Sequence, residues 1–289
     1  MKGIVLAGGA GTRLYPLTKV YSKQLALIYD KPLIYYPLSI LMLGGIKDIL
    51  IISNEETIPL YQKLFEDGSH IGLNIEYAVQ DAPRGIAESF IIGEKFINGD
   101  SVTLVLGDNI FYGKLNFLYS SLENHKTGAT IFAYRVTDPN RYGIVEFDKT
   151  GKAISIEEKP QVPKSNYAVP GLYVYDNSVV EISKSLKPSK RNELEITDVN
   201  KHYLNEGKLH VETIGRGVAW LDTGTPEALL QASNFFGVIE HRQGLKVACI
   251  EEIAYQKKFI NKTQFNKLLV TIPNSLYKDY LINMLKEEE

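Results

Sequence analysis

A chain of 289 residues is long enough for one large α/β domain or two small ones. Hydrophobic residues make up 44%, enough for a full-sized core, and the formal net charge of −2 argues against a sequence-independent nucleic-acid binder, which needs a basic excess. The single cysteine, Cys249, allows no intrachain disulfide and favours a reducing compartment. The longest apolar stretch, residues 35–46, is interrupted by proline, serine and glycine and cannot span a membrane. We therefore expect a cytoplasmic protein without a membrane partner.

Short β-branched runs alternate with helical patterns through the first part of the chain. The predicted strands are residues 4–7, 49–53, 75–79 and 102–106, and the predicted helices are residues 36–43, 56–65 and 86–96. This alternation predicts βαβ units and a Rossmann-like, mostly parallel sheet. The strands are almost wholly apolar, which indicates that helices flank both faces of the sheet.

The pattern changes after about residue 130. Predicted strands joined by short turns follow at residues 129–136, 143–147, 154–158 and 171–175, which adds an antiparallel element to the sheet. From Thr225 the chain is predicted to be mainly helical, with Thr225 as an N-cap and Pro226 in the first turn. We expect a single domain over residues 1–289, with parts at about 1–130, 131–224 and 225–289.

A glycine-rich loop follows the first predicted strand and contains Gly8, Gly9, Gly11, Thr12 and Arg13. Glycines let a phosphate approach backbone N–H groups, and Arg13 adds a permanent charge with bidentate geometry. The loop fits neither the G-x-G-x-x-G pattern of dinucleotide-binding proteins nor the Gly-Lys-Ser/Thr ending of a P-loop. It is predicted to bind phosphate; the alternative is a tight turn without a ligand.

The sequence G-G-x-G-T-R-L of this loop resembles the signature of the sugar-nucleotidyltransferase family. The resemblance continues at residues 22–25, 30–37, 106–113, 157–160, 193–198 and 220–224, and so covers nearly the whole chain. G-D-N-I-F-Y-G combined with W-L-D-T-G is much more specific than the glycine motif alone. The resemblance implies an enzyme that transfers a thymidylyl group from dTTP to α-D-glucose 1-phosphate, giving dTDP-glucose and pyrophosphate. This is the first step towards dTDP-L-rhamnose and related deoxysugars of cell-surface polysaccharides.

The resemblance also implies the catalytic residues. Arg13 binds the β and γ phosphates, Lys23 lies against the α phosphate, and Asp108 and Asp222 hold Mg²⁺, which typically takes one or two carboxylates. Asp108 follows the predicted strand 102–106, and ligands of open α/β sheets bind at that end of the strands, although Gly-Asp-Asn is also good turn chemistry. The motifs contain no Cys or His nucleophile, which agrees with an in-line single displacement.

The remaining site residues are implied in the same way. Gln80 pairs with the carbonyl and N3–H of a pyrimidine, and Gly85 leaves room for the ring. The nucleotide set is therefore Gly8, Gly9, Gly11, Thr12, Arg13, Lys23, Gln80, Gly85 and Asp108. The sugar-phosphate set is Asn109, Tyr142, Gly143, Glu158, Lys159, Val169 and Trp220. Trp220 fits core packing equally well. Pro170, where relatives often have Thr, and Leu27, where they usually have Pro, depart from the pattern.

Three alternatives stay open at this stage. The same chemistry could use another base, as in uridylyl transfer, because thymine and uracil differ by one methyl group worth about 1–3 kcal/mol of discrimination. The chain could instead be a non-catalytic regulator that binds nucleotide-sugars, although Arg13, Lys23, Asp108 and Asp222 are all present. A dinucleotide-dependent oxidoreductase is disfavoured by the glycine pattern. The resemblance further implies a homotetramer that is inhibited by a late dTDP-sugar.

Overall fold

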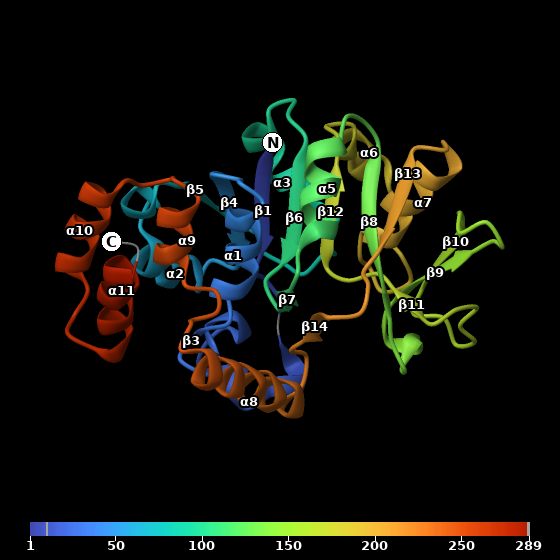
Figure 1. Ribbon diagram of the computed structural model, residues 1–289. Coiled ribbons are helices and arrows are strands. Elements are labelled where there is room, and N and C mark those ends of the chain that lie inside the picture. The colour runs from blue at the N-terminus through green and yellow to red at the C-terminus, as the bar shows by residue number, and fades with distance from the viewer. Residues whose placement is uncertain (10, 288–289) are drawn as a thin grey trace.

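A computed structural model describes residues 1–9 and 11–287 and consists of a central sheet with helices on both faces (Figure 1). The parallel core of the sheet has the order β5 (Asn74–Val79), β4 (Asp48–Ser53), β1 (Lys2–Leu6) and β6 (Val102–Leu106). Next to β6 lies the antiparallel strand β12 (Leu172–Tyr175), which joins the core to β8 (Ala129–Arg135). The α/β fold predicted from the sequence is confirmed.

Helices cover both faces because the strands are apolar on both sides. Along β1, Val5 belongs to one hydrophobic core, whereas Ile4 and Leu6 belong to the other. The Val5 side carries α1 (Tyr35–Leu43), α2 (Ile58–Phe65), α5 (Asn116–Asn124), α9 (Ile250–Gln256), α10 (Lys262–Thr271) and α11 (Leu276–Glu287). The other side carries α3 (Glu88–Ile92), α4 (Glu94–Ile97), α6 (Val179–Ser185) and α7 (Ile196–Asn205). Within the described residues, no helix has both the length and the apolarity needed to cross a membrane.

The single helix predicted for residues 86–96 is wrong, because the segment forms α3 and α4, separated at Gly93. A Cβ on Gly93 would lie 3.2 Å from Ile4 and 3.3 Å from Leu50, so the backbone approaches the sheet closely at this point. Glycine is also a poor helix former. The predicted cap at Thr225 is confirmed: its side chain accepts a hydrogen bond from the Ala228 N–H and begins α8 (Pro226–Gln243).

The predicted antiparallel element is present at one end of the sheet. It contains β9 (Gly143–Phe147), β10 (Ala153–Glu158) and β11 (Tyr167–Ala168), while β13 (Leu209–Thr213) runs parallel to β8. Figure 1 shows β9 and β10 at the opposite end of the molecule from α10 and α11. The carboxyl ends of β1 and β6 therefore lie near the place where the parallel core of the sheet meets its antiparallel strands.

Two short strand pairs lie outside the main sheet. β7 (Asn109–Gly113) pairs in antiparallel fashion with β14 (Val218–Asp222), and β2 (Leu27–Ile28) pairs with β3 (Lys31–Pro32). Asp222 ends β14 opposite Asn109. β7 was not predicted, because its first residue, Asn109, belongs to the Gly-Asp-Asn segment that favours a turn.

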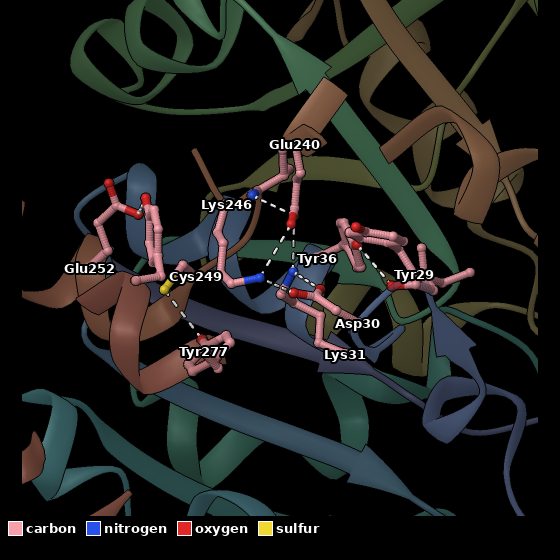
Figure 2. A network of polar contacts seen from close by, with 12 residues as sticks. Tyr29, Asp30, Lys31, Tyr36, Glu240, Lys246, Cys249, Glu252 and Tyr277 are labelled. Carbon is pink, nitrogen blue, oxygen red and sulfur yellow. Dashed lines mark hydrogen bonds and ion pairs between the residues drawn. The ribbon is translucent and has the colours of Figure 1, made fainter. Parts of the chain in front are cut away.

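A buried ring of alternating charges fastens the β2–β3 hairpin to α8 (Figure 2). Glu240 accepts from Lys31 at 3.2 Å and from Lys246 at 3.4 Å, and both lysines also pair with Asp30. Only 3% of the Lys31 side chain and 5% of the Glu240 side chain are exposed. Burial of Asp30 opposes its ionisation, but hydrogen bonds from Lys246 and Lys31 outweigh it and hold the pKa of Asp30 below its usual value.

Neutralising one member of this ring should destabilise the fold. In Glu240→Gln, Lys31 keeps only Asp30 as a counterion, and breaking a buried ion pair costs about 3 kcal/mol or more. Urea unfolding should therefore give a clearly lower midpoint. Glu181→Gln is the control, because Glu181 pairs with Lys184 at the surface with 75% of its side chain exposed. Equal midpoints for the two variants would contradict a stabilising role for the ring.

Candidate active site

Two cavities adjoin at the carboxyl end of β6. The smaller, of about 180 Å³, is lined by Gly8, Gly9, Gly11, Thr12, Arg13, Lys23, Gln24, Asp108 and Gly224. The larger, of about 720 Å³, has among its lining residues all seven that were predicted to bind sugar phosphate: Asn109, Tyr142, Gly143, Glu158, Lys159, Val169 and Trp220. The two cavities share Thr12, Arg13 and Asp108. Asp222 lines the larger cavity, whereas Gln80 and Gly85 line neither.

The glycine loop places Arg13 between the two cavities. Gly9 has a φ of +114°, a conformation that other residues rarely adopt, and the chain then forms a short 3-10 helix at Thr12–Leu14. The guanidinium of Arg13 packs against Gly224, where a Cβ would come within 2.9 Å of Nη2. Arg13 forms no ion pair with any described residue, so its charge is available to an anionic ligand.

An ion pair connects the glycine-loop side of the site to β6. Lys23 Nζ donates to Asp108 Oδ2 at 2.7 Å, and only 7% of the Lys23 side chain is exposed. The other carboxylate oxygen, Oδ1, accepts from Asn109 Nδ2 at 2.8 Å. Both oxygens of Asp108 are therefore oriented by neighbouring donors, and Lys23 is held at the wall of the smaller cavity.

The β7–β14 pairing brings Asp222 to the same place. Thr223 donates to the Asp108 carbonyl through its backbone N–H at 3.2 Å and its hydroxyl at 2.9 Å. Arg141 Nη2 lies 3.2 Å from Asp222 Oδ2. Burial and the nearby charge of Asp108 raise the pKa of Asp222 above its usual value, although Lys23, Arg141 and Arg13 act in the opposite direction.

These carboxylates fit a magnesium ion. Nowhere in the described part of the chain do three or more His, Cys, Asp or Glu side chains gather into a metal-binding group, so the protein offers the two carboxylates of Asp108 and Asp222. Mg²⁺ typically takes one or two carboxylates and completes its shell with phosphate oxygens and water. Burial and the nearby charge of Asp108 both disfavour the ionised form of Asp222, and a bound cation would favour it.

The indole of Trp220 both packs in the core and lines the larger cavity. It is 9% exposed and contacts the rings of Tyr134 and Tyr142, with centroids at 5.6 and 5.1 Å. Its N–H donates to Asn109 Oδ1 at 2.6 Å, which also accepts from the Gly171 N–H at 2.9 Å. Trp220 therefore fixes Asn109, which in turn orients Asp108.

Charged side chains line the far end of the larger cavity. Glu158 accepts from the Thr197 hydroxyl at 2.6 Å, lies 3.4 Å from Lys159 Nζ and lies 3.3 Å from Arg191 Nη2. Arg191 and Arg141 also line this cavity, and neither was predicted as a site residue from the sequence. Both lie in connecting segments outside the recognised motifs, and an isolated arginine in such a segment resembles an ordinary surface charge. Only the folded backbone brings them to the site.

Neither of the two departures from the family pattern lines either of the two cavities. The Leu27 side chain is 63% exposed on β2 and lines neither cavity. Pro170 is buried between Val169 and Gly171, which do line the larger cavity. The Val169 N–H donates to the Gly143 carbonyl at 2.8 Å, so the backbone beside Pro170 is held by the sheet.

Gly85 allows the segment that carries the predicted base-binding residues Gln80 and Gly85 to lie directly against Leu194. Its φ is +103°, and a Cβ there would lie 2.3 Å from the Leu194 carbonyl oxygen. Leu194 exchanges backbone hydrogen bonds with both flanks of Gly85, donating to Arg84 at 2.7 Å and accepting from Ala87 at 3.2 Å. The close approach requires a residue without a side chain. Room for a base remains a prediction.

Comparison with known proteins places this arrangement in a family. The model of the nucleotidyl transferase family matches residues 2–239, and the chain belongs to this family. Over 290 residues the chain is 54% identical to the glucose-1-phosphate thymidylyltransferase of Mycolicibacterium smegmatis, covering 100% of both chains. The corresponding enzyme of Neisseria meningitidis is 52% identical, with 99% of this chain and 100% of that one covered.

A solved structure agrees with these relatives. A Bacillus anthracis protein assigned as a glucose-1-phosphate thymidylyltransferase, in complex with sucrose, is 37% identical, with a TM-score of 0.76. The match covers 92% of this chain and 99% of that one. The resemblance to the sugar nucleotidyltransferases stated from the sequence is confirmed, and so is the expectation of an enzyme.

In the absence of substrates, removing the charge of Asp222 should stabilise the folded protein. Because the folded state raises the pKa of Asp222, the ionised carboxylate opposes folding at neutral pH, and this cost disappears as the pH falls below the carboxyl's unfolded pKa. Thermal unfolding in EDTA should thus give Asp222→Asn a higher midpoint than wild type at pH 7. The difference should shrink towards pH 4. A lower midpoint for Asp222→Asn at pH 7 would contradict the inference that the ionised Asp222 carboxylate opposes folding.

Proposed function

We propose that this protein transfers a thymidylyl group from dTTP to α-D-glucose 1-phosphate and releases dTDP-glucose and pyrophosphate. The observation that carries the proposal is the junction of the two cavities at Asp108, with Arg13 and Lys23 on the glycine-loop side and Lys159 on the other. Both substrates are anions, so the site must position them and neutralise their charge. Relatives at 52–54% identity over the full chain support the choice of substrates.

The residues divide the work between the two substrates. Arg13, which has no ion-pair partner among the described residues, pairs with the β and γ phosphates, and Lys23 stabilises charge at the α phosphate. Lys159 and Arg191 hold the phosphate of the sugar in the larger cavity. A phosphate oxygen of the sugar forms a bond to the α-phosphorus. The bond from that phosphorus to the bridging oxygen breaks, and its electron pair leaves with pyrophosphate.

Asp108 and Asp222 would hold Mg²⁺, which supplies charge stabilisation to phosphate oxygens when bound. The protein prepares these carboxylates in advance. Lys23 and Asn109 orient Asp108, and Arg141 contacts Asp222 at 3.2 Å. Groups oriented before substrate binding need no reorganisation during the reaction.

Pyrophosphate release tests the proposal directly. Glucose 1-phosphate is supplied with dTTP or UTP, with Mg²⁺ and then with EDTA. We expect rapid release with dTTP that EDTA abolishes, and a decrease of about a hundredfold or more in kcat for Asp108→Asn, because a metal ion contributes several kcal/mol of charge stabilisation.

The matched control is Asp67→Asn, because Asp67 caps a surface turn through Ser69 and lines neither cavity. It should retain wild-type turnover. Faster turnover of UTP than of dTTP would favour the uridylyl alternative. An absence of release with either nucleotide, from folded protein, would favour the non-catalytic regulator.

We further propose that the chain works in the cytoplasm as a homotetramer. The resemblance suggests this state, and apolar side chains exposed on α8 support it: Leu230 is 63% exposed and Val238 is 64% exposed. Exposed apolar surface of this kind often marks an interface. Light scattering should give four times the chain mass of 32.5 kDa. A monomer at micromolar concentration would contradict the proposal.

A further inference from the structure

Gln80 and Glu88 form a buried hydrogen-bonded pair at the edge of the nucleotide side. Gln80 directly follows β5 and is 7% exposed, and Glu88 begins α3 and is 8% exposed. Gln80 Nε2 donates to Glu88 Oε2 at 2.8 Å and to the Gly85 carbonyl at 3.2 Å. The other oxygen of Glu88, Oε1, accepts from Arg84 Nε at 2.6 Å.

These partners fix the orientation of the Gln80 amide. Both of its N–H groups are used, one by Glu88 and one by Gly85, so the expected donation from Gln80 to a base carbonyl is wrong for this arrangement and only the expected acceptance from N3–H remains. If the amide were turned over, its oxygen would face a carboxylate and a carbonyl, neither of which can donate a hydrogen bond. Because Arg84 occupies the second oxygen of Glu88, the carboxylate cannot turn away without losing a charge-assisted bond.

The amide oxygen of Gln80 therefore points towards the glycine loop. It lies 3.2 Å from the position that a Cβ on Gly8 would occupy, and Gly8 lines the smaller cavity. This oxygen accepts no hydrogen bond from the described residues, so it is available to a donor on a ligand. A free acceptor with fixed direction distinguishes ligands that donate at that point from ligands that accept.

We infer that Glu88 is a specificity-determining positioning residue that holds the Gln80 oxygen towards the base of the nucleotide. The inference rests on the proposed function, which assigns Gln80 to the base. Thymine and uracil carry an N–H at position 3, which donates to this oxygen. Cytosine carries an unprotonated nitrogen there, which would face the oxygen as a second acceptor. The Gln80–Glu88 pair therefore distinguishes thymine and uracil from cytosine. It does not distinguish thymine from uracil, because these differ only in a methyl group.

The test compares dTTP with dCTP, which are closely matched in size, by kcat/KM for pyrophosphate release. Wild type should prefer dTTP by at least about a hundredfold, because a polar mismatch in a buried site is strongly rejected. In Glu88→Gln the new side chain can donate to the oxygen of a turned-over Gln80 amide, which leaves only the Gly85 carbonyl opposing the turn, so an N–H can be presented to cytosine. The dTTP/dCTP ratio should fall by about tenfold or more.

Asp81→Asn is the matched control. Asp81 pairs with Arg84 at the exposed outer end of the same network, with 73% of its side chain exposed, and its carboxylate forms no hydrogen bond with the Gln80 amide. Its ratio should equal that of wild type. If Glu88→Gln does not fold, Glu88→Met removes the acceptor with a side chain of similar length and should lower the ratio in the same way.

The outcomes separate the inference from the proposed function. A ratio that stays at the wild-type value while both rates fall together would overturn the inference, because Glu88 would then be only structural. The proposed function fails separately if wild type releases no pyrophosphate with dTTP. Calorimetric titration of Mg²⁺–dTTP and Mg²⁺–dCTP gives the ratio of the two binding affinities without turnover. A merely structural role of Glu88 would leave this ratio of affinities unchanged.

Discussion

The ion pair between Lys23 and Asp108 is the contact on which the site depends. It joins residues 85 positions apart in the sequence, one beside the glycine loop and one after β6. A lysine that is 7% exposed needs such a partner, because an unpaired buried ammonium is costly. The same contact fixes the carboxylate that both cavities share. This one ion pair therefore fixes the positions of the glycine loop, β6 and Asp108 relative to one another.

Around this pair the protein tolerates unfavourable electrostatics. Asp222 is brought beside Asp108 by the register of β7 and β14, and its burial, together with the charge of Asp108, raises its pKa. The backbone of Thr223 and the guanidinium of Arg141 hold the arrangement in place. Sites that bind cations or highly charged substrates commonly accept such a cost, since ligand binding later relieves it. Stability and activity should therefore oppose each other here.

Most of the fold and much of the candidate site could be predicted from the sequence. β6 was predicted with its observed bounds because apolar strands flanked by turns are strong local signals. The break between α3 and α4 could not be predicted. It depends on the close approach of Gly93 to the side chains of Ile4 and Leu50, which are distant in the sequence. Arg141 and Arg191 carried no local signal either. Their place at the larger cavity depends on strand pairings between segments that are remote in the sequence.

The close approach of Gly85 to Leu194 has a consequence for protein engineering. The backbones of the segment around Gly85 and the segment around Leu194 are joined there by hydrogen bonds of 2.7 and 3.2 Å, with no space for a side chain. We call this contact the backbone seam. The two segments are thus not structurally independent of each other. A chimaera that exchanges residues 80–88 with those of another family member must also exchange residues 189–195. Recombination points for library construction belong outside this seam, where the two segments are inherited together.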